Sequence, residues 1–373
     1  MRRYGRQMHP YDRTADTFAR GVVHAGNGPS CLLRQNRIMN IESTPAQYGS
    51  VFGEACFAIA GIEDEQCDVQ IIRYDTGETL GVKRFRGVQS CRVNAAPYMR
   101  TELDIRPMND FFTGLYPSGR TVSCAVACGD TMSEAVLLTA AAVETATGKL
   151  LSDIASVRSI GHGDWDELSF IAPFSIVEMN ILMYGAQASA NVNISEDQLG
   201  ADIIAAVVCT DDIAEMFSQQ TGKQPDELEE FTVEIYADYV PVTSVNYRVE
   251  PSANGMRLGW VNRYGCMDYF SFPVVCSRSL SVEKSRILSG EGYRTIGINA
   301  EESAVVSSGY RPKDEIRALT AILSSPAVWR SEQGVPDRMD ITTGQVECMR
   351  YGEPTEIRIT LRPAQKTAAQ IIR

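Results

Sequence analysis

The alternation of apolar and polar residues predicts a chain built mostly of short β-strands. Residues 231–236 (FTVEIY) and 356–361 (EIRITL) alternate strictly, which places every second side chain on one face of a sheet. Between residues 52 and 174, β-rich runs are separated by turn sequences at intervals of about eight to twelve residues, and Asp75-Thr76-Gly77-Glu78 predicts a hairpin. This spacing favours a sandwich or barrel over a parallel α/β sheet.

Few segments have the period of a helix. Residues 211–220 fit one, with an N-cap within residues 210–212 and Gly222 at the C-cap position. A second short amphipathic helix is predicted from Pro312 to about Ser325. Residues 199–208 fit either a helix face or a strand, because Ile and Val suit both.

Residues 257–272 (RLGWVNRYGCMDYFSF) predict strand, tight turn and strand. Asn262 and Gly265 stand at the first and last positions of a four-residue turn, where both are favoured. We expect Trp260 and Phe272 to pack in a core, and residues 245–249 to form a strand that pairs toward this hairpin. The hairpin contains no catalytic arrangement.

This hairpin resembles the virion and tail-structure proteins of tailed phages, prophages and phage-like injection systems of gut bacteria. The likeness extends to the C-terminal third, through residues 324–329 (SSPAVW) and a final strand near 356–364, and departs from the pattern at Cys266, where a second Gly is expected. The resemblance implies a structural component of a tail or virion without enzymatic activity. The residues that carry it are Trp260, Asn262, Gly265, Asp268, Phe270 and Phe272.

Length and composition indicate a folded protein of more than one domain. The chain has 373 residues, of which 44% are hydrophobic and 22% charged, and is long for a single core. We expect a mainly β fold with two β-sandwich or barrel-like domains, a few short helices and an extended N-terminal arm. The expected boundaries are residues 1–45 for the basic arm, 46–175 for one β-rich domain, and 176–373 for a second with an acidic insertion at about 196–230. No apolar run approaches the roughly eighteen residues of a membrane span.

Charge is distributed unevenly along the chain, whose formal net charge is −12. Residues 1–41 carry seven Arg against two Asp, whereas residues 159–247 carry only Lys223 against sixteen acids. The basic residues are 29 Arg and 6 Lys, and arginine is favoured at interfaces. The acidic block fits either a solvated face or complementary docking between copies.

The sequence contains no motif of a known catalytic class. A phosphate loop, a Gly-x-Ser-x-Gly elbow, a His-Glu-x-x-His pair and a dinucleotide fingerprint are all missing. Residues 162–167 (HGDWDE) are the one place where a histidine meets several carboxylates, and a turn leading into a strand accounts for them. The ten cysteines predict reduced, core-filling thiols. We therefore expect no catalytic residue, no cofactor and no metal.

The resulting hypothesis is a structural subunit of a phage tail or phage-like particle that is made in the bacterial cytoplasm and acts by self-association and docking to other virion proteins. Arg2, Arg3 and Arg6 of the arm and Tyr264 at the turn tip are the candidate interface residues, since an aromatic at a turn tip is least expected to be buried within one subunit. A nucleic-acid partner and a small-molecule substrate are not expected, although contact between the arm and DNA stays open.

Two other functions stay open at this stage. A β-sandwich module that binds carbohydrate or a cell surface would display exposed Trp and Tyr over a shallow groove. A glycoside-hydrolase-like enzyme would assemble its carboxylate pair from positions distant in sequence.

Overall fold

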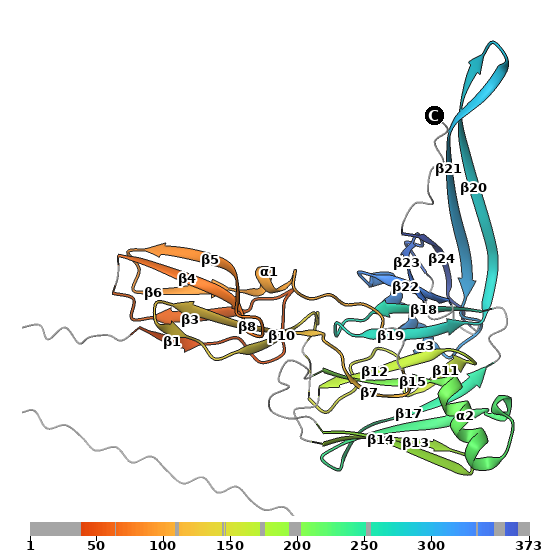
Figure 1. Ribbon diagram of the computed structural model, residues 1–373, viewed down its shortest axis with the longest axis horizontal. Helices are drawn as coiled ribbons and strands as arrows, with labels where there is room; N and C mark the ends of the chain where they lie inside the picture. Colours follow the sequence, from red (N-terminus) through yellow and green to blue (C-terminus); the bar gives the residue numbers. More distant parts are fainter. Residues whose placement is uncertain are drawn as a thin grey trace, which may run out of the picture. The chain divides into compact units, whose positions relative to one another are not determined.

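The computed structural model describes residues 39–63, 65–108, 112–143, 145, 147–171, 176–193, 203–250, 255–332, 335–346 and 355–364. The chain divides into two compact units, Met1–Arg37 and Ile38–Arg373, and the first lies outside the described residues. The predicted mainly β fold is confirmed: the described strands form five sheets, accompanied by a few short helices (Figure 1). No helix in the described ranges is long and apolar enough to cross a membrane.

Two sheets of the N-terminal part pack face to face. One has the order β1 (Asn40–Ser43), β3 (Cys56–Ala60), β6 (Ser90–Asn94). The other has the order β2 (Gly49–Ser50), β10 (Val136–Thr139), β8 (Thr121–Cys128), β4 (Gln66–Arg73), β5 (Glu78–Arg86), with β9 (Thr131–Met132) beside β8 and helix α1 (Ala96–Met99) following β6. Phe57 of the first sheet and Ile71 of the second belong to one buried cluster. The predicted β4–β5 hairpin is confirmed, with Gly77 at φ 71°.

A second pair of sheets surrounds another core. One has the order β11 (Val157–Gly161), β17 (Val240–Glu250), β16 (Glu230–Ala237), β13 (Ile176–Met183), β14 (Ala186–Asn193). The other has the order β12 (Trp165–Ile171), β15 (Ile203–Cys209), β7 (Gly114–Pro117). Helix α2 (Thr210–Thr221) confirms the helix predicted over 211–220, and Gly222 caps it in the left-handed region at φ 73°. The N-cap prediction is wrong, because Cys209 holds that position without a side-chain cap bond.

Strand pairing here differs from the sequence-based expectations in two respects. Strand β17 pairs with β16 and β11, and not with the 257–272 hairpin. The reason is local: Asp238 and Tyr239, both with positive φ (47° and 66°), form a two-residue connection that folds β17 directly back onto β16. In addition, β12 pairs with β15 and β11 with β17, so pairing crosses the expected boundary at residue 175. Of the ambiguous segment 199–208, the described residues 203–208 belong to strand β15 and not to a helix.

The C-terminal part is one seven-stranded sheet. Its order is β19 (Met267–Phe272), β18 (Met256–Val261), β22 (Val328–Glu332), β23 (Val335–Ile341), β24 (Arg358–Pro363), β21 (Gly292–Ser307), β20 (Val274–Ser289). The predicted helix after Pro312 is present as two short helices, α3 (Lys313–Leu319) and α4 (Ala321–Ser324), which meet at Thr320. Ile316, Leu319 and Ile322 of these helices pack in the same buried cluster as the sheet.

The hairpin predicted over 257–272 is strands β18 and β19. Trp260 and Phe272 are fully buried, which confirms both as core residues. The Asn262 side chain builds the turn: its Oδ1 accepts hydrogen bonds from the backbone N–H groups of Tyr264 (2.9 Å) and Cys266 (3.1 Å), and its Nδ2 donates to the carbonyl of Leu151 (2.9 Å).

The prediction that the cysteines are all reduced is wrong for one pair. Cys67 of β4 and Cys128 of β8 form a disulfide that joins adjacent strands of one sheet. They are 61 residues apart in sequence, so spacing alone could not reveal the pair. Cys124, on the same strand as Cys128, is buried and free, as a core-filling cysteine should be.

We predict that Gly265→Ala destabilises the fold more than Gly77→Ala. Both glycines have positive φ (72° and 71°), so both variants carry the backbone cost of roughly 1–2 kcal/mol. A Cβ at Gly265 would lie 2.7 Å from the carbonyl carbon of Ala140, whereas a Cβ at Gly77 meets nothing within 4 Å. The free energy of unfolding measured in urea should therefore be about 1–3 kcal/mol lower for Gly265→Ala than for Gly77→Ala. Equal free energies of unfolding would contradict the close contact.

Candidate functional site

A buried ionic cluster is centred on strand β12. Asp166 and Glu167 are adjacent on this strand and therefore point to opposite faces, and both are at most 2% exposed. On the Glu167 side, Arg120 donates to both carboxylate oxygens, with 2.8 Å between Nη2 and Oε2, and its Nη1 also contacts Ser169 Oγ at 3.1 Å. Burial by itself lowers the pKa of Arg120, but the charge of Glu167 outweighs this and raises it, so the pair stays ionised.

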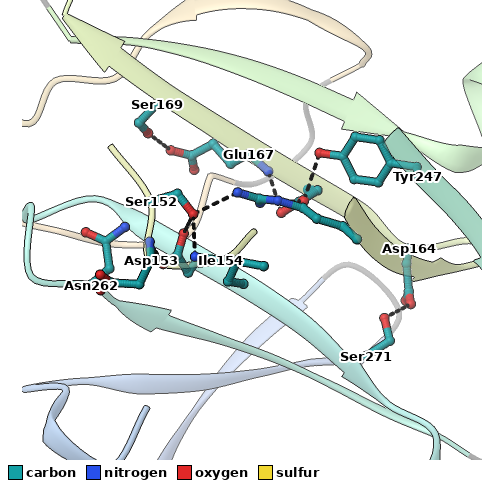
Figure 2. Close-up of polar contacts among 12 residues, drawn as sticks. Ser152, Asp153, Ile154, Asp164, Glu167, Ser169, Tyr247, Asn262 and Ser271 are labelled. Atoms are coloured by element: carbon teal, nitrogen blue, oxygen red, sulfur yellow. Dashed lines mark hydrogen bonds and ion pairs between the residues drawn. The ribbon is translucent and has the colours of Figure 1, made fainter. Parts of the chain in front are cut away.

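On the other face of β12, Asp166 receives two donors. Arg158 Nη1 of β11 and the hydroxyl of Tyr247 of β17 contact its Oδ2 at 2.8 and 2.9 Å (Figure 2). Burial, together with Asp166, raises the pKa of Tyr247 well above its ordinary value, so its proton stays in this hydrogen bond. Through Asp166, strand β12 of one sheet is fastened to two strands of the neighbouring sheet.

Asp268 of β19 extends the cluster to the C-terminal sheet. Ser152 donates its hydroxyl to Oδ1 at 2.5 Å, and the backbone N–H of Asp153 donates to Oδ2 at 2.9 Å. Arg158 Nη2 reaches Ser152 Oγ at 2.7 Å, which links the two carboxylates through one hydroxyl (Figure 2). Burial raises the pKa of Asp268 to about 6, although Arg158 and the two donors act in the opposite direction.

This cluster joins sheets. Glu167 and Asp268 are both fully buried, and Asp166 is 2% exposed; each of these carboxylates has a hydrogen-bond donor within the fold. Sequence reasoning did not find the cluster because its arginines and acids come from segments up to about 150 residues apart. The one available signal was the 162–167 segment, two of whose acids are its centre.

A cleft of about 180 Å³ lies next to the cluster. Its acidic residues are Asp164 and Glu250, and its basic residues are Arg257, Arg278 and Arg330. Asp164 accepts hydrogen bonds from the Ser271 hydroxyl (2.6 Å) and from the Gly161 N–H (3.1 Å), and Glu250 is paired with Arg311 at 3.0 Å. Both acids therefore have partners within the fold. In the described ranges, no group of His, Cys, Asp or Glu could hold a metal ion.

The most exposed secondary structure is a two-stranded ribbon, the paired strands β20 and β21. They pair over nearly their whole length, but β24 covers β21 only between Ala304 and Ser307, so both strands continue past their sheet (Figure 1). Strand register divides the ribbon into two faces. The first, called here the apolar face, carries Arg278, Leu280, Val282, Lys284, Arg286, Leu288, Tyr293, Thr295, Ile298, Ala300 and Glu302. The second, called here the serine face, carries Ser277, Ser279, Ser281, Glu283, Ser285, Ile287, Arg294, Gly297, Asn299, Glu301 and Ser303.

The apolar face continues the core-facing side of the sheet. On β21, Ala304 and Val306 are buried in the C-terminal core, and Ala300 and Ile298 follow them on the same face. Farther along the ribbon this face is open: Leu280 is 63% exposed, Leu288 72% and Tyr293 77%. The amphipathic pattern of the ribbon is therefore that of a buried strand pair, although the fold leaves it uncovered.

The residues singled out from the sequence are placed as follows. Arg2, Arg3 and Arg6 lie outside the described residues. Tyr264 is half buried and packs against a cluster that contains Leu151 and Cys266, so part of its side chain is covered within the subunit. Its role at an interface stays a prediction. Asn262 Oδ1 accepts a hydrogen bond from the backbone N–H of Tyr264 and so holds the turn.

The three tryptophans offer no exposed platform of the kind that a carbohydrate-binding module needs. Trp260 is fully buried and Trp329 is 9% exposed. Trp165 is half buried and its ring lies 4.6 Å from that of Tyr269. All three side chains pack against other residues of the fold.

Comparison with known proteins gives no family. No family model matches the chain, and no curated protein matches it. Among solved structures, a crystal structure of Dpr2 Ig1-Ig2 in complex with DIP-Theta Ig1-Ig3 covers 87% of this chain and 89% of its own, with 10% sequence identity and a TM-score of 0.18. A similarity at that level carries no argument about function.

We predict that Asp268 makes the protein less stable as pH rises from acid to neutral. Its pKa is about 6 in the fold and 3.8 ordinarily, so the folded state holds the proton more tightly. This contribution is fully present below 3.8 and is lost as pH rises through about 6. The free energy of unfolding of the wild type relative to Asp268→Asn should therefore fall by on the order of 1–3 kcal/mol between about pH 4 and pH 7.

Urea unfolding at several pH values measures this difference. The exposed Asp226→Asn variant is the matched control, and its stability should follow that of the wild type at each pH. Parallel curves for Asp268→Asn and the wild type would contradict the prediction.

Proposed function

We propose that this protein is a structural subunit of a phage tail or phage-like particle, which works by self-association and by docking to other components and not by catalysis. The observation that carries the proposal is the uncovered apolar face of the β20–β21 ribbon. This face exposes Leu280, Val282, Leu288 and Tyr293 between its charged residues, and a group of exposed apolar side chains of this kind is typical of a binding surface.

The energetics of the ribbon favour a covered state. A two-stranded hairpin by itself is at best marginally stable in water, and this one lacks a third strand along most of its length. Covering a fully exposed Leu or Val side chain contributes roughly 1.5–3 kcal/mol. Leu280, Val282, Leu288 and Tyr293 are all at least 45% exposed, so docking against another protein surface would stabilise the ribbon itself.

The phage setting rests on the resemblance of the β18–β19 hairpin, and the position of that hairpin supports the link to assembly. Trp260, Phe270 and Phe272 of the resembling pattern pack in the C-terminal core. Strand β20 begins at Val274, directly after Phe272 and Pro273. The resembling segment is thus the packed base from which the ribbon leaves the sheet, as expected of a module that presents an assembly element.

We predict that the wild type forms defined oligomers and that polar substitutions on the apolar face abolish them. Light scattering after size exclusion, with negative-stain imaging of each peak, should give a multiple of 41.0 kDa for the wild type. The variant Leu280→Ser, Val282→Ser, Tyr293→Ser should give the monomer mass, because it removes apolar area without touching the core.

The control changes the serine face instead, with Ser279→Ala, Ser281→Ala and Ser285→Ala, and should keep the oligomer mass. A wild-type monomer at every concentration and salt would overturn self-association, as would an unchanged oligomer in the apolar-face variant. Mass spectrometry of phage-like particles purified from the host tests the setting, and absence of the protein from them would sink that part of the proposal.

A further inference from the structure

The apolar face of the ribbon also carries net positive charge. It holds Arg278, Lys284 and Arg286 against the single acid Glu302. Within the described part of the chain, none of these three cations forms an ion pair. A partner for this face therefore needs an apolar surface bordered by acids.

The same chain presents a surface rich in unpaired acids, called here the acidic edge. It is formed by Asp226 and Glu227 of the short helix η2 (Pro225–Glu227) and by Glu229 and Glu230, where β16 begins. Glu229 and Glu230 are adjacent on extended backbone and point to opposite sides of this edge, and Glu227 Oε1 accepts a hydrogen bond from the backbone N–H of Gln224 at 3.0 Å. All four are exposed, and none is in an ion pair among the residues that the structure describes.

Two cations lie close to the acidic edge. Lys223 sits 5.6 Å from the ring centre of the exposed Tyr184, and Arg248 is opposite Glu230 in the β16–β17 register. With four acids and these two cations the edge stays negative, and Tyr184, at 85% exposure, supplies apolar area beside it.

We propose that the apolar face of the ribbon in one copy docks against the acidic edge of a second copy of this chain. The inference rests on the proposed function and names the partner surface. Opposite charges on two different surfaces of one chain fix which surfaces meet, because like surfaces repel.

The same cations favour docking through the apolar face over strand addition at the edge of the ribbon. Lys284 and Arg286 lie on β20, which is the edge strand of its sheet, and positive side chains on an edge strand oppose pairing with another strand. The side chains of the apolar face have no such obstacle when the partner is acidic.

The two surfaces are different, so the contact is heterologous. Each copy offers one ribbon and one acidic edge, and such contacts produce closed rings, of which a reciprocal dimer is the smallest, or open filaments. Because part of the attraction is electrostatic between exposed groups, salt should weaken the assembly.

Charge reversal on each surface tests the contact. Lys284→Glu, Arg286→Glu on the ribbon and Glu229→Lys, Glu230→Lys on the acidic edge should each weaken assembly roughly tenfold or more, as read from the concentration dependence of mass in light scattering. A chain that carries all four changes restores opposite charge and should assemble again, which a folding defect could not produce.

The matched control is Glu42→Lys, Glu78→Lys, which makes the same change in net charge at two exposed acids away from the acidic edge and should assemble like the wild type. If Leu280→Ser, Val282→Ser, Tyr293→Ser dissociates the oligomer but Glu229→Lys, Glu230→Lys does not, the ribbon docks elsewhere and only this inference fails. Failure of the four-fold variant to reassemble would overturn it equally. A wild type that never assembles removes the proposed function as well.

Discussion

The structure depends on the rule that a charge taken out of water must be paired. Strand β12 places a carboxylate on each of its faces, and neither has access to solvent. Each is therefore tolerated only because an arginine from another segment meets it, Arg120 on one side and Arg158 on the other. Breaking one such pair leaves a buried charge, which costs about 3–5 kcal/mol. The Arg158–Asp166 pair thus adds a directional contact between two sheets that already share an apolar core.

Asp268 shows how far this constraint reaches. It belongs to β19, in a different sheet from β12, yet its two oxygens are satisfied by Ser152 and the backbone of Asp153, and Ser152 in turn is held by Arg158. One polar chain thus passes from the β11 strand to the C-terminal sheet. Both oxygens of Asp268 have donors within the fold, whereas Nε of Arg158 is buried without a hydrogen-bond partner among the described residues.

The charges of the β20–β21 ribbon are exposed, in contrast to those of the buried cluster. Its cations take part in no ion pair among the described residues, and Leu280, Leu288 and Tyr293 are largely open to solvent. Exposed apolar side chains also occur elsewhere, for example Tyr184 and Tyr239, but the ribbon gathers several of them on one strand pair. The serine face is suited to water, and Ser279 and Ser303 contact one another there at 2.7 Å. The ribbon thus has one mainly polar face and one face with exposed apolar side chains. The proposals of assembly and of an acidic docking partner rest on this difference.

The sequence by itself determined what depends on neighbours along the chain. Alternation identified most strands, the α2 helix and its Gly222 cap followed from local propensity, and the turn at Asn262 followed from side-chain chemistry. Pairing between distant segments was decided only in three dimensions. The pairing of β17 with β11, the Cys67–Cys128 disulfide and the Arg120–Glu167 pair join residues whose separation in sequence carries no information on their distance. The partial burial of Tyr264 belongs to the same class, because a turn tip is exposed or covered according to what packs over it.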